Sequence, residues 1–352
     1  MKFDSHSFVI EYKTEVEEED DSCIIIQKHG EIIVGRADGY INTLSSDFKA
    51  KYSFQSHEKM MDILQNTEVP EAINAVEKVD YGNRSSMIFV LNDDRLKIWD
   101  VRKHFRRYKN SLVKTIPNFT NYIGNSLSEM DGDLLSADMF VIKISNLEKI
   151  EAPICLINNK VNNSNRNVLI NKADFVEPEI FGHCKTDGSV IFNDLRASIS
   201  SKNILSINVA KRRGDCQLDG AFRSVTDFKV IDNQIVARNA GAVIFYDKRY
   251  PGVELKRVTS AFEGERPLHP KRETVYKKFQ MAVWKKQIVT GMENHIALLN
   301  EHSKRAVEVE DAGRIQYVSA GEDSFCAYYD KKIMMFHPRK KSCSGAKRNE
   351  DD

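Results

Sequence analysis

The chain lacks the features that would indicate a zinc site, a secreted disulfide framework or a membrane span. Its six cysteines are scattered without C-x-x-C spacing, and such scattered cysteines are typical of a reducing compartment. No apolar run reaches the roughly 18 residues that a spanning helix needs, and the first twelve residues hold no apolar signal-peptide core. We therefore expect a soluble cytoplasmic protein, with the nucleus as a second location and no membrane partner.

The chain also lacks a charge imbalance and the common catalytic motifs. Lys plus Arg is 52 and Asp plus Glu is 51, so no overall field favours nucleic acid. The strings G-x-x-x-x-G-K-[ST], G-x-G-x-x-G, G-x-S-x-G and H-E-x-x-H are absent, which excludes the usual phosphate loops, nucleophile elbow and zinc-protease site. We expect no catalytic residue, no metal and no cofactor in this chain.

A weak repeat does run along the chain. Each copy is a short apolar strand, a turn built on Asp, Asn or Gly, and a second strand, as in 32–41 and 87–100. These turn residues tolerate the positive φ angles that a tight hairpin requires. The turn residues recur about 36 to 55 residues apart, and they are Asp38, Asp93, Asp138, Asp187, Asn239, Asn294 and Asp330.

Seven copies at this spacing predict an all-β fold, a seven-bladed β-propeller of WD-repeat type. The only literal W-D dipeptide is Trp99-Asp100. A sandwich or barrel with similar turns is the structural alternative. The predicted propeller covers residues 1–337, with blades near 22–48, 72–102, 120–147, 167–197, 222–250, 274–300 and 312–337. A strand at 7–12 closes the ring, and the tail 338–352, which lacks periodic apolar positions, is expected to be disordered.

One segment resembles a known family. Phe54-Gln55-Ser56-His57-Glu58 reads F-Q-S-H-E, and the residues Asp62, Leu64, Glu68, Ile73 and Asn74 follow at the offsets of a second motif. Both motifs are similar to those of the B-type regulatory subunit of protein phosphatase 2A. The likeness continues in order through Leu135-Ser136-Ala137-Asp138, Asp194-Leu195-Arg196-Ala197-Ser198 and Ser224-Val225-Thr226-Asp227.

The resemblance implies a regulatory subunit without catalysis of its own. In that family a β-hairpin arm projects from the second blade, and arm and propeller base dock on a helical-repeat scaffold subunit. The top face meets the catalytic subunit and recruits phosphoprotein substrates. The expected arm lies near 49–71, and the residues expected to dock on the scaffold are Phe54, Gln55, Ser56, His57, Glu58, Asp62 and Leu64. The alternative for Phe54 to Glu58 is that they are strand residues that fix the fold of the arm.

The substrate-groove rim is the part where the chain departs from the family. Tyr122 and Asp138 keep family positions, whereas Met139 replaces the second aspartate of the S-A-D-D motif. A methionine offers adaptable apolar contact in place of charge. Two other functions stay open: a WD-repeat platform or substrate receptor of another complex, in ubiquitin ligation or ribosome biogenesis, and a propeller hydrolase that uses funnel carboxylates.

Overall fold

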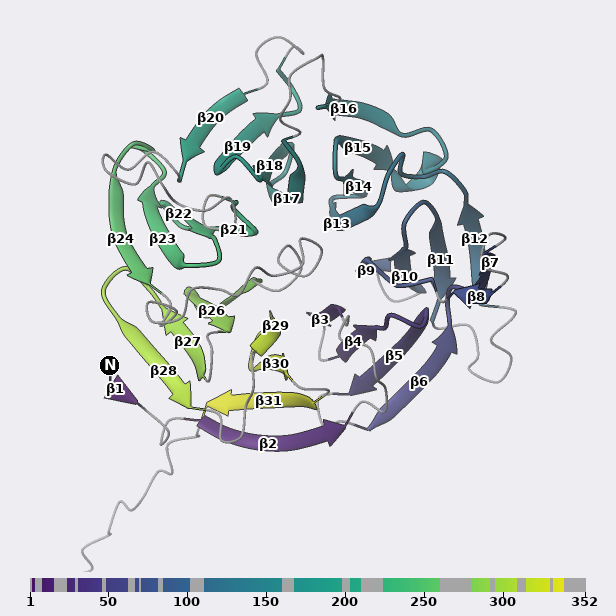
Figure 1. Cartoon of the computed structure of the whole chain (residues 1–352), viewed down its shortest axis with the longest axis horizontal. Coiled ribbons are helices and arrows are strands. Elements are labelled where there is room, and N and C mark those ends of the chain that lie inside the picture. The colour runs from purple at the N-terminus through teal and green to yellow at the C-terminus, as the bar shows by residue number, and fades with distance from the viewer. Residues whose placement is uncertain are drawn as a thin grey trace, which may run out of the picture.

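The strands of the chain form a closed ring of seven blades (Figure 1). The computed structural model describes residues 2–3, 8–15, 24–28, 31–45, 49–62, 67–69, 71–81, 85–101, 111–159, 168–197, 203–209, 224–259, 280–291, 295–308, 315–329 and 332–338. In these residues each blade is a sheet of four antiparallel strands, to which blade six adds a short parallel strand. The predicted seven-bladed propeller is confirmed, and a sandwich or barrel is excluded.

The first four blades use consecutive strands. Blade one holds β3 (Ile24–Lys28), β4 (Glu31–Gly35), β5 (Tyr40–Ser45) and β6 (Ala50–Gln55), and blade two holds β9 (Ala75–Tyr81), β10 (Ser85–Leu91), β11 (Leu96–Asp100) and β12 (Leu112–Ile116). Blade three holds β13 (Gly124–Met130), β14 (Asp133–Asp138), β15 (Val141–Asn146) and β16 (Ile154–Asn158), with the 3-10 turn η2 (Leu147–Lys149). Blade four holds β17 (Ile170–Glu177), β18 (Ile180–Lys185), β19 (Ser189–Asp194) and β20 (Asn203–Asn208).

Blade five also uses consecutive strands, whereas blades six and seven include strands from the N-terminus. Blade five holds β21 (Asp227–Ile231), β22 (Gln234–Arg238), β23 (Ala242–Asp247) and β24 (Glu254–Thr259). Blade six holds β25 (Met281–Trp284), β26 (Gln287–Gly291), β27 (His295–Leu299) and β28 (Lys304–Glu308), with β1 (Lys2–Phe3) parallel to β28. Blade seven joins β29 (Ile315–Ala320), β30 (Phe325–Tyr329) and β31 (Lys332–Pro338) to β2 (Phe8–Glu15), which closes the ring.

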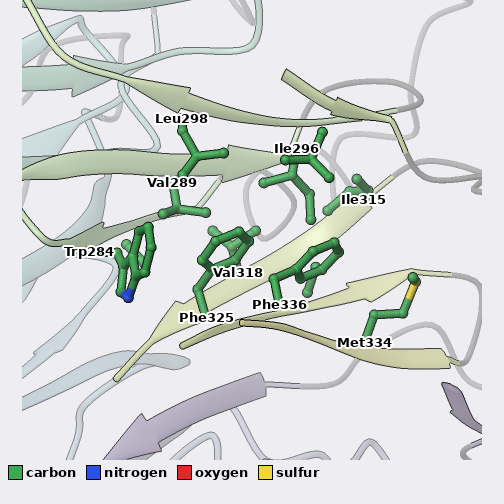
Figure 2. Packing of buried hydrophobic residues seen from close by; sticks show 12 residues of the cluster. Trp284, Val289, Ile296, Leu298, Ile315, Val318, Phe325, Met334 and Phe336 are labelled. Carbon is green, nitrogen blue, oxygen red and sulfur yellow. The ribbon is translucent and has the colours of Figure 1, made fainter. Parts of the chain in front are cut away.

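Hydrophobic side chains gather between neighbouring blades. The cluster between blades six and seven shows the pattern (Figure 2): Trp284 and Phe325 pack edge to face at 5.4 Å, and Phe325 stacks on Phe336 at 4.9 Å between ring centroids. Six further clusters join the other neighbouring pairs of blades. The middle strands of each blade are covered on both faces by neighbouring blades. Their sequences are therefore continuous apolar runs, such as the buried Ile88–Leu91 in β10.

Blades four and five are also joined by two reciprocal ion pairs on their innermost strands. Lys172 Nζ lies 2.7 Å from Asp227 Oδ1, and Lys229 Nζ lies 2.7 Å from Asp174 Oδ2. Burial alone would raise the pKa of Asp174, but Lys229 and Lys172 outweigh it and hold that pKa below its usual range. Each carboxylate thus has a lysine as its counter-ion, and removing either lysine would leave a buried negative charge uncompensated.

The observed blades differ in extent from the predicted ranges. The first six predicted ranges contain three strands and end before the fourth, outer strand. In blade seven the outer strand is β2, which overlaps the closing strand predicted at 7–12. The clearest case is β6, which pairs with β5 as the outer strand of blade one, although the arm was predicted to begin at residue 49. The outer strands of blades one to six were missed because only one of their faces is covered, so few of their residues are apolar. Of the predicted tail, Pro338 ends β31, and 339–352 lie outside the described residues.

Candidate functional site

One face of the ring carries the residues singled out by the sequence, and we call it the loop face. In a blade of four antiparallel strands, the turn between the second and third strands and the connection to the next blade leave at the same end. The loop face of the first three blades therefore includes the turns 36–39, 92–95 and 139–140 and the connections 56–74 and 117–123.

The segment Phe54–Glu58 forms a buried joint between blades one and two. The backbone N–H groups of Ser56 and His57 donate to the carbonyl oxygen of Gly39 at 2.8 and 3.1 Å. Trp99 Nε1 donates to Ser56 Oγ at 2.9 Å, and Lys97 Nζ donates to the Ser56 carbonyl at 2.7 Å. The ring of Phe54 packs against that of Trp99 with 4.7 Å between centroids. Phe54, Ser56 and His57 are buried, Gln55 is half-buried and Glu58 is exposed.

Two details show how tightly this joint is packed. Gly39 has φ +86°, and a Cβ atom there would lie 2.2 Å from the His57 carbonyl oxygen, so only glycine fits this turn. His57 is fully buried. Burial, reinforced by the neighbouring positive charge of Lys97, lowers the pKa of His57 to about 3. The imidazole is therefore neutral near pH 7, and its contribution is to packing.

The joint and a second clamp support a short hairpin. Beyond the hairpin, the backbone N–H of Asn74 donates to the Leu91 carbonyl at 2.9 Å, and Asn74 Nδ2 donates to Asp93 Oδ1 at 2.6 Å. Asn92 Nδ2 donates to Glu71 Oε2 at 2.7 Å. Both ends of the connection 56–74 are thus held to the turns of blades one and two. Figure 1 shows the hairpin outside the second blade.

The hairpin itself presents apolar side chains to solvent. It consists of β7 (Met60–Asp62) and β8 (Thr67–Val69), with Met60 opposite Val69 and Asp62 opposite Thr67. Met60 is 47% exposed, Met61 55% and Val69 43%. The predicted residue Leu64 lies outside the described residues. Exposed methionines on a rigidly held element are suited to contact with another protein.

The predicted substrate rim lies on the loop face of blade three. Asp138 is 1% exposed, and its Oδ1 accepts hydrogen bonds from the backbone N–H groups of Phe140 and Val141 at 2.8 and 2.7 Å. Its Oδ2 accepts from the Asn121 N–H at 3.0 Å. This carboxylate holds the turn together and does not face solvent. Tyr122 packs edge to face on Phe140 at 4.8 Å, beside Met139.

Sequence reasoning missed two residues of this surface, Ile123 and Phe140. Ile123 is 47% exposed and Phe140 is half-buried beside Tyr122. The available signal was Met139-Phe140, because two large apolar residues are unusual in a turn where polar residues are preferred. An exposed apolar group here suggests recognition of a partner by packing.

The described residues hold no group of three or more His, Cys, Asp or Glu side chains placed to bind a metal ion. In the same part of the chain, no helix is long and apolar enough to cross a bilayer. The adjacent acids Asp93 and Asp94 lie in the turn between β10 and β11. Asp93 accepts a hydrogen bond from Asn74 there, which is a structural role.

Comparison with known proteins identifies the fold through solved structures and not through sequence similarity. No protein-family model matches the sequence, and no curated protein matches it. The WD40 propeller domain of Doa1 superposes with a TM-score of 0.63 at 13% identity, over 95% of this chain and 98% of that domain. This chain has the WD40 propeller fold.

Two further structures share that fold. Raptor from Chaetomium thermophilum matches with a TM-score of 0.69 and 11% identity over 96% of this chain, which spans 29% of the Raptor chain. A chain in the crystal structure of a mitotic checkpoint complex matches with a TM-score of 0.65 and 10% identity, over 96% of this chain and 94% of that one. Identities this low show the architecture of the WD40 propeller alone.

Proposed function

We propose that the chain is a non-catalytic regulatory subunit of a heterotrimeric phosphatase similar to protein phosphatase 2A. In this proposal the hairpin β7–β8 docks on a helical-repeat scaffold subunit in the cytoplasm or nucleus. The loop face then holds phosphoprotein substrates near the catalytic subunit, so that a bimolecular encounter becomes a local one. A WD40 propeller is suited to this role because it offers several rigid surfaces to protein partners.

The observation that carries the proposal is the position of the resembling residues. Phe54, Ser56, His57 and Asn74 belong to the two motifs that resemble the phosphatase subunit. In the structure Phe54, Ser56 and His57 lie in the joint, and Asn74 lies in the second clamp, on the two sides of the hairpin. Their burial means that direct docking by Phe54, Ser56 and His57 would require the joint to open. We therefore propose that they position the hairpin, whose Met60 and Met61 make the contact.

Affinity purification of the tagged full chain tests this function. We expect a helical-repeat scaffold and a serine/threonine phosphatase to be recovered with the wild type. The double variant Met60→Glu, Met61→Glu should reduce recovery at least about tenfold, because charging two central apolar contacts costs more than about 1.4 kcal/mol of binding.

The matched control is Val253→Glu, at an equally exposed position (52%) beside β24 on the opposite side of the ring (Figure 1). It should recover both partners as the wild type does. Recovery of neither partner with the wild type would contradict the proposed function. A ubiquitin ligase or ribosome-biogenesis complex in their place would favour the alternative platform.

A further inference from the structure

The outer edge of blade six differs from those of the other blades. In the described residues, the outer strand of every other blade pairs with its neighbour through a bulge, whereas β28 pairs with β27 in unbroken register from Lys304 to Glu308. A bulge bends an edge strand and disrupts its row of N–H and C=O groups. The regular edge of β28 is therefore the one best suited to pair with a further strand.

This edge already carries a short strand. β1 runs parallel to β28 at the rim of the ring (Figure 1), with Lys2 opposite Arg305 and Phe3 opposite Ala306. The described pair is two residues long and is followed by Asp4, which lies outside the described residues. Its register sets a lysine beside an arginine, and like charges that face each other across two strands destabilise their pairing. A strand this short, with this charge, is a weak occupant of the edge.

Positive charge collects where β28 begins, at the face of the ring opposite the loop face. Lys304 and Arg305 are the first two residues of the strand, and Arg305 is exposed. Lys256 Nζ, from blade five, donates to the carbonyl oxygens of Asn300 and Ser303 at 2.9 and 3.2 Å, in the turn that precedes the strand. Burial, reinforced by the positive charge of Lys304, lowers the pKa of Lys256. Three cationic residues therefore lie together at this end of the edge.

The carboxylates near this end offset only part of the charge. Glu301, in the same turn, accepts a hydrogen bond from Gln234 of blade five, and it balances one of the three cations. Glu254 forms an ion pair with Arg257 at 2.8 Å and so adds no net charge. Glu308 lies at the far end of β28. The start of the β28 edge therefore keeps a net positive charge.

We propose that an extended acidic segment of a partner protein displaces β1 and pairs with the edge of β28. The segment sets Asp or Glu beside Arg305, where β1 has Lys2, and an apolar residue beside Ala306, where β1 has Phe3. Because main-chain groups make the pairing, the edge selects a polypeptide over other anions. This inference goes beyond the proposed function and does not depend on it, since the hairpin β7–β8 lies outside blade two.

Two synthetic peptides labelled with fluorescein test the proposal on the full chain. They read Ser-Glu-Phe-Thr-Val-Ser and Ser-Lys-Phe-Thr-Val-Ser, so they differ only in the residue meant to lie beside Arg305. In anisotropy titrations the glutamate peptide should bind about threefold to tenfold more tightly than the lysine peptide. N-methylation of its Phe, Thr and Val amides should abolish binding, because the main-chain donors are lost.

Variants of β1 and β28 give the decisive comparisons. Phe3→Pro disfavours β1 as a paired strand and should tighten binding of the glutamate peptide about threefold or more, since the competing strand is released. Lys2→Glu improves the charge match of β1 with Arg305 and should weaken that binding about threefold. Arg305→Glu should reverse the preference, so that the lysine peptide binds more tightly.

The matched control is Lys114→Glu, which reverses a charge on β12, the bulged outer strand of blade two. It should leave both affinities unchanged. Failure of Phe3→Pro to bind the glutamate peptide, or an unchanged preference in Arg305→Glu, would overturn the proposal. Equal binding of the N-methylated peptide would also overturn it, since charge attraction without strand pairing would then explain the result.

Discussion

The joint between blades one and two and the platform of blade three lie on the same loop face, but they differ in what reaches solvent. The platform is the apolar surface formed by Tyr122, Ile123, Met139 and Phe140. At the joint, Ser56 and His57 are buried beneath the hairpin they support. At the platform, Asp138 is buried and Ile123 stands exposed above it. In both regions a buried polar side chain accepts hydrogen bonds: Ser56 accepts from the Trp99 indole, and Asp138 accepts from the backbone of the turn that follows it.

The positions that match the motifs of the phosphatase subunit and the position that departs from them differ in burial. The residues kept from its motifs, Phe54 to His57 and Asp138, hold the backbone in place. The residue that departs from the motif, Met139, lies at the surface. Positions that shape the loop face are thus retained, while a position that a partner could contact has changed. Under the proposed regulatory function, the hairpin surface and the surface at Met139 would therefore be altered independently.

The largest effect expected from this comparison is loss of stability at the joint. Trp99→Ala removes the ring that packs on Phe54 and the donor to Ser56 Oγ. A buried Trp to Ala change costs about 3–5 kcal/mol, whereas Ile123→Ala at the platform should cost less than about 1 kcal/mol. Urea unfolding followed by far-UV circular dichroism, which reports on the backbone, measures the free energy of unfolding of both variants. Equal shifts in the two midpoints would show that the joint is not the more tightly packed region.

The second largest effect is a dependence of the free energy of unfolding on pH that arises at the joint. His57 has a pKa of about 3 in the folded chain against an ordinary value of 6.5, so the unfolded chain binds the extra proton. Stability is therefore complete above about pH 6.5 and falls as the pH drops towards 3, by up to about 1.4 kcal/mol for each pH unit per histidine. His183, also buried with a pKa of about 3, adds a similar dependence.

The measurement is the free energy of unfolding between pH 7 and 5. His57→Asn should lose one histidine's share of the slope, whatever its stability at pH 7. His302→Asn, at an exposed turn, is the matched control and should keep the full slope. A slope unchanged in His57→Asn would contradict a buried neutral imidazole at the joint.

The sequence predicted the fold better than the site, for physical reasons. Turn residues such as Asp38 and Asp187 follow local steric rules, so the seven repeats could be counted without tertiary information. The outer strands of blades one to six were missed because they are half exposed, and all of them except β28 pair with their neighbour through a bulge. In β6, for example, Lys51 falls between Tyr52 and Ala50, which pair with Thr43 and Leu44. An inserted residue of this kind breaks the alternating pattern.

Side-chain direction was the part that local sequence did not reveal. The burial of Ser56 depends on Trp99, which comes from the next blade. Asp138 was predicted as a groove-rim carboxylate, but it turns inward because three N–H groups converge on it. The scaffold-docking residues stay a prediction, now with Met60 and Met61 as the exposed part of the hairpin.

The smallest expected effect on stability is at Met139, and it gives the sharpest form of the comparison. Met139→Asp restores the carboxylate of the resembling motif at a half-exposed position, so the free energy of unfolding should change by less than about 0.5 kcal/mol. Asp138→Asn, one residue earlier, leaves converging N–H groups without a charged acceptor and should cost about 1–3 kcal/mol. Urea unfolding compares the two variants. If Met139→Asp instead destabilises the fold as much as Asp138→Asn does, the side chain belongs to the core of blade three and not to its surface.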